Sequence, residues 1–408
     1  MAKKKKSFAD RLKNMGPAAL VTSAFIGPGT ITTATLAGVN YEYELLWAGL
    51  FSGLALMILM EMSGRLAIIG QKDIREATIA SAGNNKVMGK IITALVLITL
   101  VMTGFGFEAG NLIGGSLGFA DLLGLPQWLS AVILGGVAFY AVVIGTAKTL
   151  EKLMSLFVGV MGFIFILTMV LVGPNWGDVL KGMVIPSVPE GSIVNVISLI
   201  GTTLIGINLL MHAVNAKEKW NRPEDLEDAN FDTVFNVGIG ILTTLAIVVA
   251  AGAVLYGSGT EVTSPIVFSQ MLKPVLGDYA RYIGDAGITA AGLSSAIATP
   301  LILKEVSAYT FGWDSNDLRA RMIGGAAVIF GAVFAAFGTS PVTIIVFASG
   351  MSGVFLPIVA IMIMISANNE EIMGSYKNNV VQNILGGIAT LVTLGLGINS
   401  LLNFISNF

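Results

Sequence analysis

The chain contains no cysteine and only one histidine, His212, among its 408 residues. The lack of cysteine excludes disulfides, thiolate metal sites and a nucleophilic thiol, and a single histidine excludes a cluster of imidazole ligands. Charged residues are also scarce: they make up 12% of the chain, against about 25% in an ordinary soluble domain. No nucleophile–base set or metal cage is visible, so we do not expect an enzyme.

Apolar residues dominate instead, at 54% of the chain. Several runs exceed the ~18 apolar residues typical of a membrane-spanning helix, and they are solid rather than alternating, unlike the strands of a β-barrel. The sequence predicts an all-α polytopic membrane protein. We place its eleven spans at 17–39, 45–69, 89–118, 127–147, 153–173, 192–216, 231–257, 281–303, 321–339, 342–366 and 380–404.

Basic residues predict the orientation of these spans, because loops rich in Lys and Arg stay in the cytoplasm. Only three of the 23 basic residues fall in outer segments, namely Lys181, Lys273 and Arg281. The basic N-terminus, 1–16, lacks the short apolar core and cleavage site of a signal peptide. We expect a multi-pass protein of the inner (plasma) membrane, with a cytoplasmic N-terminus and an extracytoplasmic C-terminus.

An odd number of spans in the first half permits an inverted repeat, as in many secondary transporters. The first five-helix repeat would cover 17–173 and the second, inverted repeat 192–366. The segment 380–404 would be an additional eleventh helix.

Two of these spans carry breaks. Gly27, Pro28 and Gly29 interrupt the first span, because proline lacks an N–H and glycine permits unusual backbone angles. Broken backbone is tolerated in a membrane only where it lines a cavity or binds a ligand. The sixth span, "SLIGTTLIGINLLMHAVNAKEKW", is interrupted near Gly201 and Gly206.

Paired breaks predict a substrate site near the middle of the membrane. The predicted substrate-binding residues are Gly27, Gly29, Thr30, Thr202, Thr203, Ile205 and Asn208.

Polar residues within the spans are candidates for ion coupling. Glu108 and Asn111 share a face of the third span, and His212 follows Asn208 by one turn. Either set could instead be structural, as we expect for the Glu61–Arg65 pair, an ion pair or an inner gate.

A second coupling hypothesis is a sodium site formed by hydroxyls of the eighth span with carbonyls of the first. Its candidate residues are Phe25, Ile26, Ser294, Ser295 and Thr299. Hydroxyls that only pack helices are the alternative. The coupling ion would be H⁺ or Na⁺, and no other cofactor is expected.

Several of these segments resemble the Nramp family of proton-coupled divalent-metal transporters: "GPAALVTSAFIGPGTITTATLAGVNYEYELLW", "RLAIIGQKDIREA", "GFADLLGLPQW", "GTTLIGINLLMHA" and "PVLGDYARYIGDAGITAAGLSSAIAT". The resemblance runs through spans one to ten. It implies a LeuT-type fold with two inverted five-helix repeats and an eleventh helix. It also implies that Glu108, Asn111 and His212 occupy positions linked with proton transfer in the family.

The family's metal ligands are not retained, which suggests a divergent branch. Gly27 and Thr30 replace the aspartate and asparagine of its Asp-Pro-Gly-Asn motif, and Thr202 and Ile205 replace the Ala and Met of its Ala-x-x-Met motif. A divalent cation needs anionic oxygens or strong nitrogen or sulfur donors, which these residues do not offer, so no metal ligand is assigned.

We therefore predict a secondary transporter for a small polar or zwitterionic organic solute, amino-acid-like, that works by alternating access. Its carboxylate would bind N–H groups near Gly29 and Thr30, and its ammonium group the carbonyls of the sixth span. A divalent metal cation (Mn²⁺ or Mg²⁺) at an altered site is one alternative, and a non-transporting receptor or scaffold is another. The expected partners are this substrate and the lipid bilayer. Nothing indicates nucleic acid or a protein partner.

Overall fold

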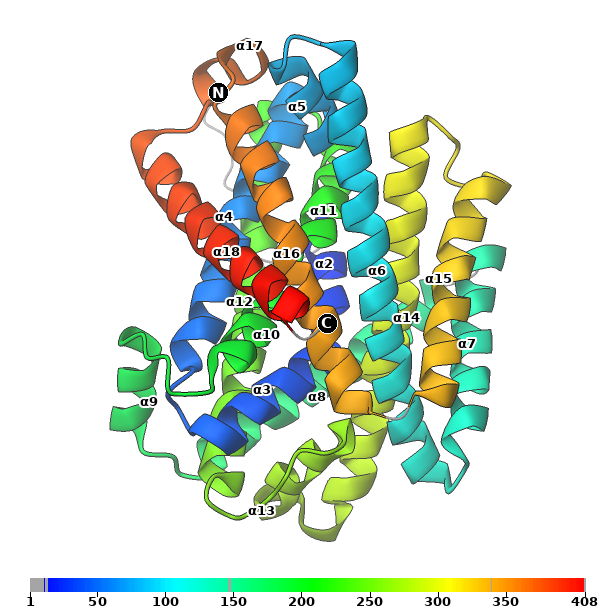
Figure 1. Ribbon diagram of the computed structural model, residues 1–408, viewed down its shortest axis with the longest axis vertical. Helices are drawn as coiled ribbons and strands as arrows, with labels where there is room; N and C mark the ends of the chain where they lie inside the picture. The colour runs from blue at the N-terminus through cyan, green and yellow to red at the C-terminus, as the bar shows by residue number, and fades with distance from the viewer. Residues whose placement is uncertain (1–10, 12–13, 146–147, 339, 407–408) are drawn as a thin grey trace.

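The computed structural model describes residues 11, 14–145, 148–338 and 340–406, which are helical apart from their turns and connections (Figure 1). The basic N-terminus thus lies almost entirely outside the described residues. The longer helices are α2 (Pro17–Phe25), α3 (Pro28–Tyr41), α4 (Leu46–Gly70), α6 (Lys86–Leu123), α7 (Gln127–Ile144), α8 (Lys148–Leu171), α10 (Ile193–Thr203), α11 (Gly206–Lys219), α12 (Leu226–Leu255), α14 (Ala280–Phe311), α15 (Leu318–Phe337), α16 (Pro341–Ala367) and α18 (Val380–Ser406).

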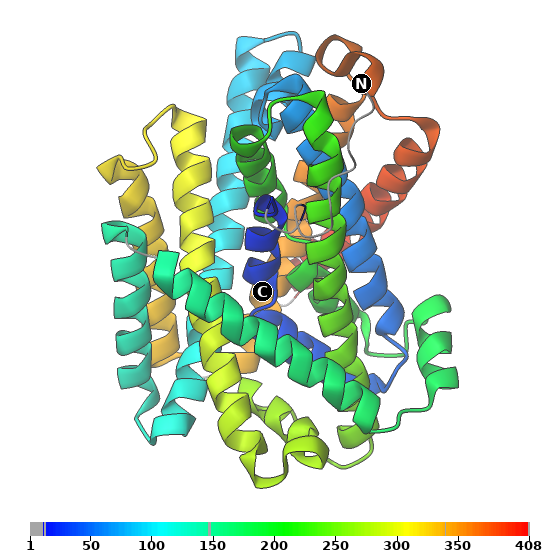
Figure 2. The same ribbon diagram turned by 180° about the vertical axis from the view of Figure 1, so that it is seen from behind.

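Ten of the eleven expected membrane spans fall on helices that could cross a membrane. Within the described residues, nine helical segments are long and apolar enough to cross a membrane, and the bent pair α2–α3 makes a tenth. The remaining predicted span, 153–173, falls on α8, whose 24 residues match the length that a bilayer requires. Figure 2 shows α8 running obliquely across the back of the molecule.

The short helices lie at the two ends of the bundle (Figure 1). A short surface helix, α5 (Ile74–Ser81), follows the second span and lies at the same end as α17 (Glu370–Met373). At the opposite end lie α9 (Trp176–Val184) and α13 (Lys273–Leu276), which the sequence analysis did not anticipate. Connections that alternate between two ends are those expected for consecutive spans.

A close helix crossing stands beside the first break. The helices α6 and α14 meet where a Cβ added to Gly292 would lie 2.4 Å from the Cα of Gly115. Only glycine allows two backbones to approach so closely. The crossing brings polar residues of both helices next to Gly27.

The surface helix α5 is held by a capping box and by α11. Asp73 accepts from the backbone N–H of Glu76, and Glu76 accepts from that of Asp73. Lys217 also pairs with Glu76 at 2.9 Å. Burial favours a higher pKa for Glu76, but the hydrogen bonds from Lys217 and the Asp73 backbone outweigh it and hold the pKa below its ordinary value.

Candidate functional site

The first break separates α2 from α3, and the chain bends by 55° there. Since Pro28 has no N–H, the Ala24 carbonyl lacks its helical donor. The hydroxyl of Ser295, on α14, lies 3.3 Å from the carbonyl oxygen of Ser23 and 3.4 Å from that of Ala24. A side chain of α14 therefore replaces hydrogen bonds that the broken helix cannot make.

The second break lies between α10 and α11, as predicted. Leu204 has φ −92° and ψ 86°, and Ile205 has φ −110° and ψ 124°, so neither is helical. The two helices nevertheless follow one another as a single span, Ile193–Lys219.

The two breaks lie against each other, because α3 packs on α10 (Figure 1). The hydroxyl oxygens of Thr33 and Thr202 are 3.3 Å apart. A Cβ added to Gly29 would lie 3.5 Å from Cγ2 of Thr202, an ordinary van der Waals contact. The structure thus brings together the predicted residues of the first and sixth spans.

All the predicted substrate-binding residues are buried: Gly27, Gly29, Thr30, Thr202, Thr203, Ile205 and Asn208. Thr30 donates to the Phe25 carbonyl, and Thr202 to the Leu199 carbonyl at 3.1 Å. Among the described residues, Oγ1 of Thr203 and Nδ2 of Asn208 have no hydrogen-bond partner. No group of three or more His, Cys, Asp or Glu residues that could hold a metal occurs in the described ranges.

Position 27 is closely packed by neutral polar groups. A Cβ added to Gly27 would lie 2.7 Å from Oγ of Ser295 and 3.3 Å from Oδ1 of Asn111. Real Cβ atoms do not approach other atoms within 3.0 Å without displacing them. A hydroxyl and an amide therefore stand where a carboxylate at position 27 would begin.

Asn111 links α6 to α14 beside the first break, since its Nδ2 donates to Oγ1 of Thr299 at 3.2 Å. Glu108, one turn earlier on α6, is completely buried. Neither of its carboxylate oxygens has a hydrogen-bond partner in the part of the chain that the structure describes. A buried acid without partners is available to bind a proton or a polar ligand.

The predicted sodium residues are placed differently from the expectation in one respect. Ser295 contacts the carbonyls of Ser23 and Ala24 rather than those of Phe25 and Ile26. The reason is local: Pro28 leaves the Ala24 carbonyl without its donor, and Thr30 donates to the Phe25 carbonyl. Ser294 and Thr299 are also buried on α14. A sodium ion at this site stays a prediction.

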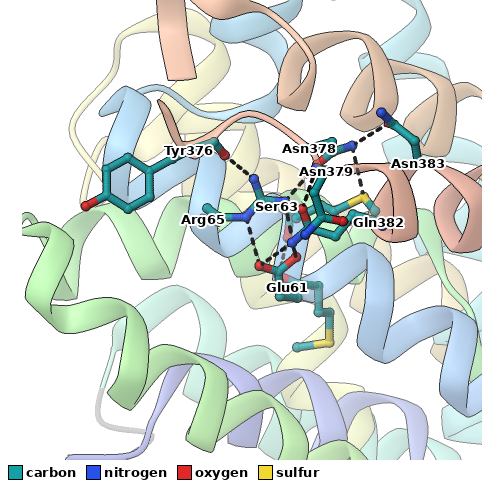
Figure 3. A network of polar contacts seen from close by, with 10 residues as sticks. Glu61, Ser63, Arg65, Tyr376, Asn378, Asn379, Gln382 and Asn383 are labelled. Atoms are coloured by element: carbon teal, nitrogen blue, oxygen red, sulfur yellow. Dashed lines mark hydrogen bonds and ion pairs between the residues drawn. The ribbon is translucent and has the colours of Figure 1, made fainter. Parts of the chain in front are cut away.

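The Glu61–Arg65 ion pair expected from the sequence is present, with Nε of Arg65 at 2.8 Å from Oε1 of Glu61. Figure 3 shows that the network extends further. Arg65 also donates to the Tyr376 carbonyl and, at 2.7 Å, to Oδ1 of Asn378. The segment before α18 is thereby fixed to the end of α4. No local pattern predicts the contact between Arg65 and Asn378, because the two residues are 313 positions apart.

Besides Glu108, a second buried acid has a role that was not predicted from the sequence. Asp232, in the second turn of α12, accepts from the backbone N–H groups of Gly16 at 3.1 Å and Ala18 at 2.9 Å. These are among the N–H groups that have no intrahelical partner at the start of α2. Asp232 therefore acts as the cap of the first broken helix.

Solved structures share this architecture. A variant of the manganese transporter of Eremococcus coleocola superposes with a TM-score of 0.79 at 18% identity, covering 98% of this chain and 88% of that one. The structure of MhsT in complex with L-phenylalanine gives a TM-score of 0.61 at 14% identity, covering 98% and 99%. With its paired breaks, the chain has the LeuT-type fold.

The sequence comparisons identify the family within that class. Residues 18–403 match the family described as natural resistance-associated macrophage protein-like, abbreviated Nramp. The divalent metal cation transporter MntH of Yersinia pestis is 23% identical over 95% of this chain and 94% of its own length. The chain belongs to the Nramp family and is a membrane transporter of that family.

Proposed function

We propose that the chain is a secondary active transporter for a small polar or zwitterionic organic solute, amino-acid-like in chemistry. The observation that supports this most directly is the packing at position 27, where the Ser295 hydroxyl would have to move to admit even a Cβ and the nearest groups are neutral. Thr30, Thr202 and Ile205 add no charge. A site of this kind compensates poorly for a dehydrated divalent cation but can hydrogen-bond a neutral or zwitterionic solute.

The two breaks offer complementary groups for such a solute. The first N–H groups of α3, including that of Gly29, have no intrahelical acceptor and favour a carboxylate. The last carbonyls of α10 favour an ammonium group for the opposite reason. Thr203 and Asn208 contribute a hydroxyl and an amide without partners among the described residues. The remaining predicted site residues would shape the pocket.

Coupling belongs to the same proposal. A proton would use the buried Glu108 and His212, with Asn111 beside the first break. Alternatively, a sodium ion would use hydroxyls of α14, with Ser295 next to the free carbonyls of α2. The N-terminus is assigned to the cytoplasm and the C-terminus to the outside from the distribution of basic residues.

A divalent metal cation is the second candidate, and the comparisons favour it over an organic solute. The relatives are named as divalent metal cation or manganese transporters. A small cation such as Mg²⁺ would have to keep several of its waters and bind carbonyls, hydroxyls and the amide of Asn208.

Uptake into proteoliposomes separates the candidates. The assay compares Mn²⁺, Mg²⁺ and a pool of labelled amino acids, with and without proton or sodium gradients. We expect saturable uptake from the amino-acid pool and none of the metals. Saturable metal uptake would establish the second candidate, and failure to take up or bind any of these probes would favour a receptor or scaffold.

A matched pair of glycine variants ties uptake to the breaks. In Gly29→Ala the new methyl meets Thr202 at an acceptable 3.5 Å, so the protein should fold with the pocket narrowed. In Gly136→Ala, on α7, the methyl meets nothing within 4 Å. Uptake should fall in the first variant and not in the second. Equal uptake by the two variants would move the substrate site away from the breaks.

A further inference from the structure

His212, the only histidine of the chain, has an asymmetric environment. It lies on α11 with 1% of its surface exposed. Its Nδ1 is 3.1 Å from Oγ of Ser63, on α4. Its Nε2 has no hydrogen-bond partner among the residues that the structure describes. The two ring nitrogens are therefore not equivalent.

Ser63 has a single hydroxyl proton, and a second contact determines where that proton goes. Oγ of Ser63 also lies 3.1 Å from the carbonyl oxygen of Met60, one turn earlier on α4. A carbonyl can only accept a hydrogen bond, so the hydroxyl must donate to it. The Ser63 oxygen can then only accept a hydrogen bond from His212, so Nδ1 must carry the imidazole proton.

The opposite arrangement is less favourable. If Ser63 donated to Nδ1, Nε2 would carry the proton and become a buried N–H without an acceptor among the described residues. In the Nδ1–H form Nε2 is likewise without a partner, as a bare lone pair, so the environment of Nε2 does not separate the two tautomers. The contact of Ser63 with the Met60 carbonyl does separate them, because it would lose its hydrogen if Ser63 donated to Nδ1. This contact favours the Nδ1–H tautomer.

Gly64 fixes the orientation of the ring. A Cβ at Gly64 would lie 2.9 Å from Cε1 of His212, so the imidazole packs directly against the backbone of α4. Consecutive residues of α4 thus hold the ring, Gly64 by contact and Ser63 by a hydrogen bond. Such a partner at one ring nitrogen determines which form the other nitrogen takes.

We propose that Ser63 is a positioning residue that holds neutral His212 in the Nδ1–H tautomer, which leaves Nε2 as a bare acceptor. Nε2 is then the atom at which His212 takes up a proton or accepts a hydrogen bond from a solute or water. The tautomer follows from the contacts of Ser63 alone. Only its consequence for transport rests on the proposed function.

Because the chain has one histidine, ¹⁵N-histidine labelling yields signals from a single imidazole. In the full-length protein in detergent or lipid at neutral pH, we expect a pyrrole-like Nδ1 and a pyridine-like Nε2. The reverse pattern in the wild-type protein overturns the proposal. This measurement needs no variant and no knowledge of the substrate.

Two variants test the role of Ser63. Ser63→Ala should move the proton to Nε2 or give a mixture of tautomers, and Ser63→Thr, which keeps the hydroxyl, should preserve the Nδ1–H signals. Ser52→Ala is the matched control: Ser52 is buried on the same helix and donates to the Gly49 carbonyl at 2.8 Å. Unchanged signals in Ser63→Ala, or altered signals in Ser52→Ala, refute the assignment.

Transport provides a separate readout. Where the wild-type protein shows uptake, Ser63→Ala should reduce it about tenfold, the low end of the loss found when a partner that orients a metal-bound histidine is removed. Ser52→Ala should leave it unchanged. An Nδ1–H tautomer in a protein without uptake would contradict the proposed function and leave the role of Ser63 intact. Normal uptake by Ser63→Ala with an altered tautomer would overturn the functional consequence alone.

Discussion

Gly27→Asp is the most informative single change, because it places a carboxylate at the position where the family's metal motif has one. The new Cβ would begin 2.7 Å from Oγ of Ser295 and 3.3 Å from Oδ1 of Asn111. Ser295 would have to rotate and give up its contacts with the free carbonyls of α2. We expect this overpacking alone, as in Gly27→Ala, to destabilise the protein by about 1–3 kcal/mol.

The carboxylate adds a second penalty. The atoms nearest to the Cβ position belong to the neutral side chains of Ser295 and Asn111, so no cation among them compensates the charge. A buried unsatisfied polar group costs about 1–3 kcal/mol more, so Gly27→Asp should lose about 2–6 kcal/mol in total.

Thermal unfolding of the purified protein measures these losses. Gly27→Ala should lower the apparent Tm, and Gly27→Asp should lower it further. The double variant Gly27→Asp with Ser295→Ala should recover the steric part only. Gly136→Ala serves as the control for adding a methyl to a helix without a contact. A Gly27→Asp protein as stable as the wild type would refute the packing argument, and strong stabilisation of it by Mn²⁺ would show that a metal site is easily restored.

Three further predictions concern the framework. Asp232→Ala should destabilise the protein by about 2–4 kcal/mol, because it removes the acceptor of two backbone N–H groups at the start of α2. Asp232→Asn should cost less, and unfolding measurements that rank the two variants the other way would contradict the capping role. Arg65→Lys should lower the apparent Tm clearly, since lysine cannot reproduce the forked contacts of the buried guanidinium. Arg281→Lys, at an exposed pair, should leave the apparent Tm nearly unchanged, and similar effects at both sites would count against the network. Finally, the chain has no native cysteine, so Ser375→Cys and Glu190→Cys can be labelled singly in intact cells; an impermeant maleimide should reach only the second, and the opposite result would invert the predicted orientation.

The spans and the first break could be predicted from the sequence because their signals are local. Long apolar runs determine the spans, and Gly-Pro-Gly interrupts a helix wherever it occurs. The second break was weaker as a signal, since Gly201 and Gly206 lack a proline, and its two helices still form one span. The correspondence between the two breaks followed from the odd span count of the first half, which permits an inverted repeat. The resemblance to the Nramp family is confirmed by the comparisons.

The polar contacts around the site could not be predicted, because they join residues far apart in the chain. Ser295 lies 271 positions from Ala24, and Ser63 lies 149 from His212. Span patterns say which helix a residue occupies, but they do not say which carbonyl it faces. The contact of Ser295 with the Ser23 and Ala24 carbonyls is of this kind. The small helices α9 and α17 carried a usable signal, an asparagine that caps each one, Asn175 and Asn369.

The central claim is that the paired breaks hold the substrate without a protein carboxylate. Equilibrium binding of Mn²⁺ to the purified wild-type protein and to Gly29→Ala tests it most directly. We predict no saturable Mn²⁺ binding that depends on Gly29, while a component of the amino-acid pool binds the wild type and not the variant. Stoichiometric Mn²⁺ binding by the wild type that is lost in Gly29→Ala would contradict the claim.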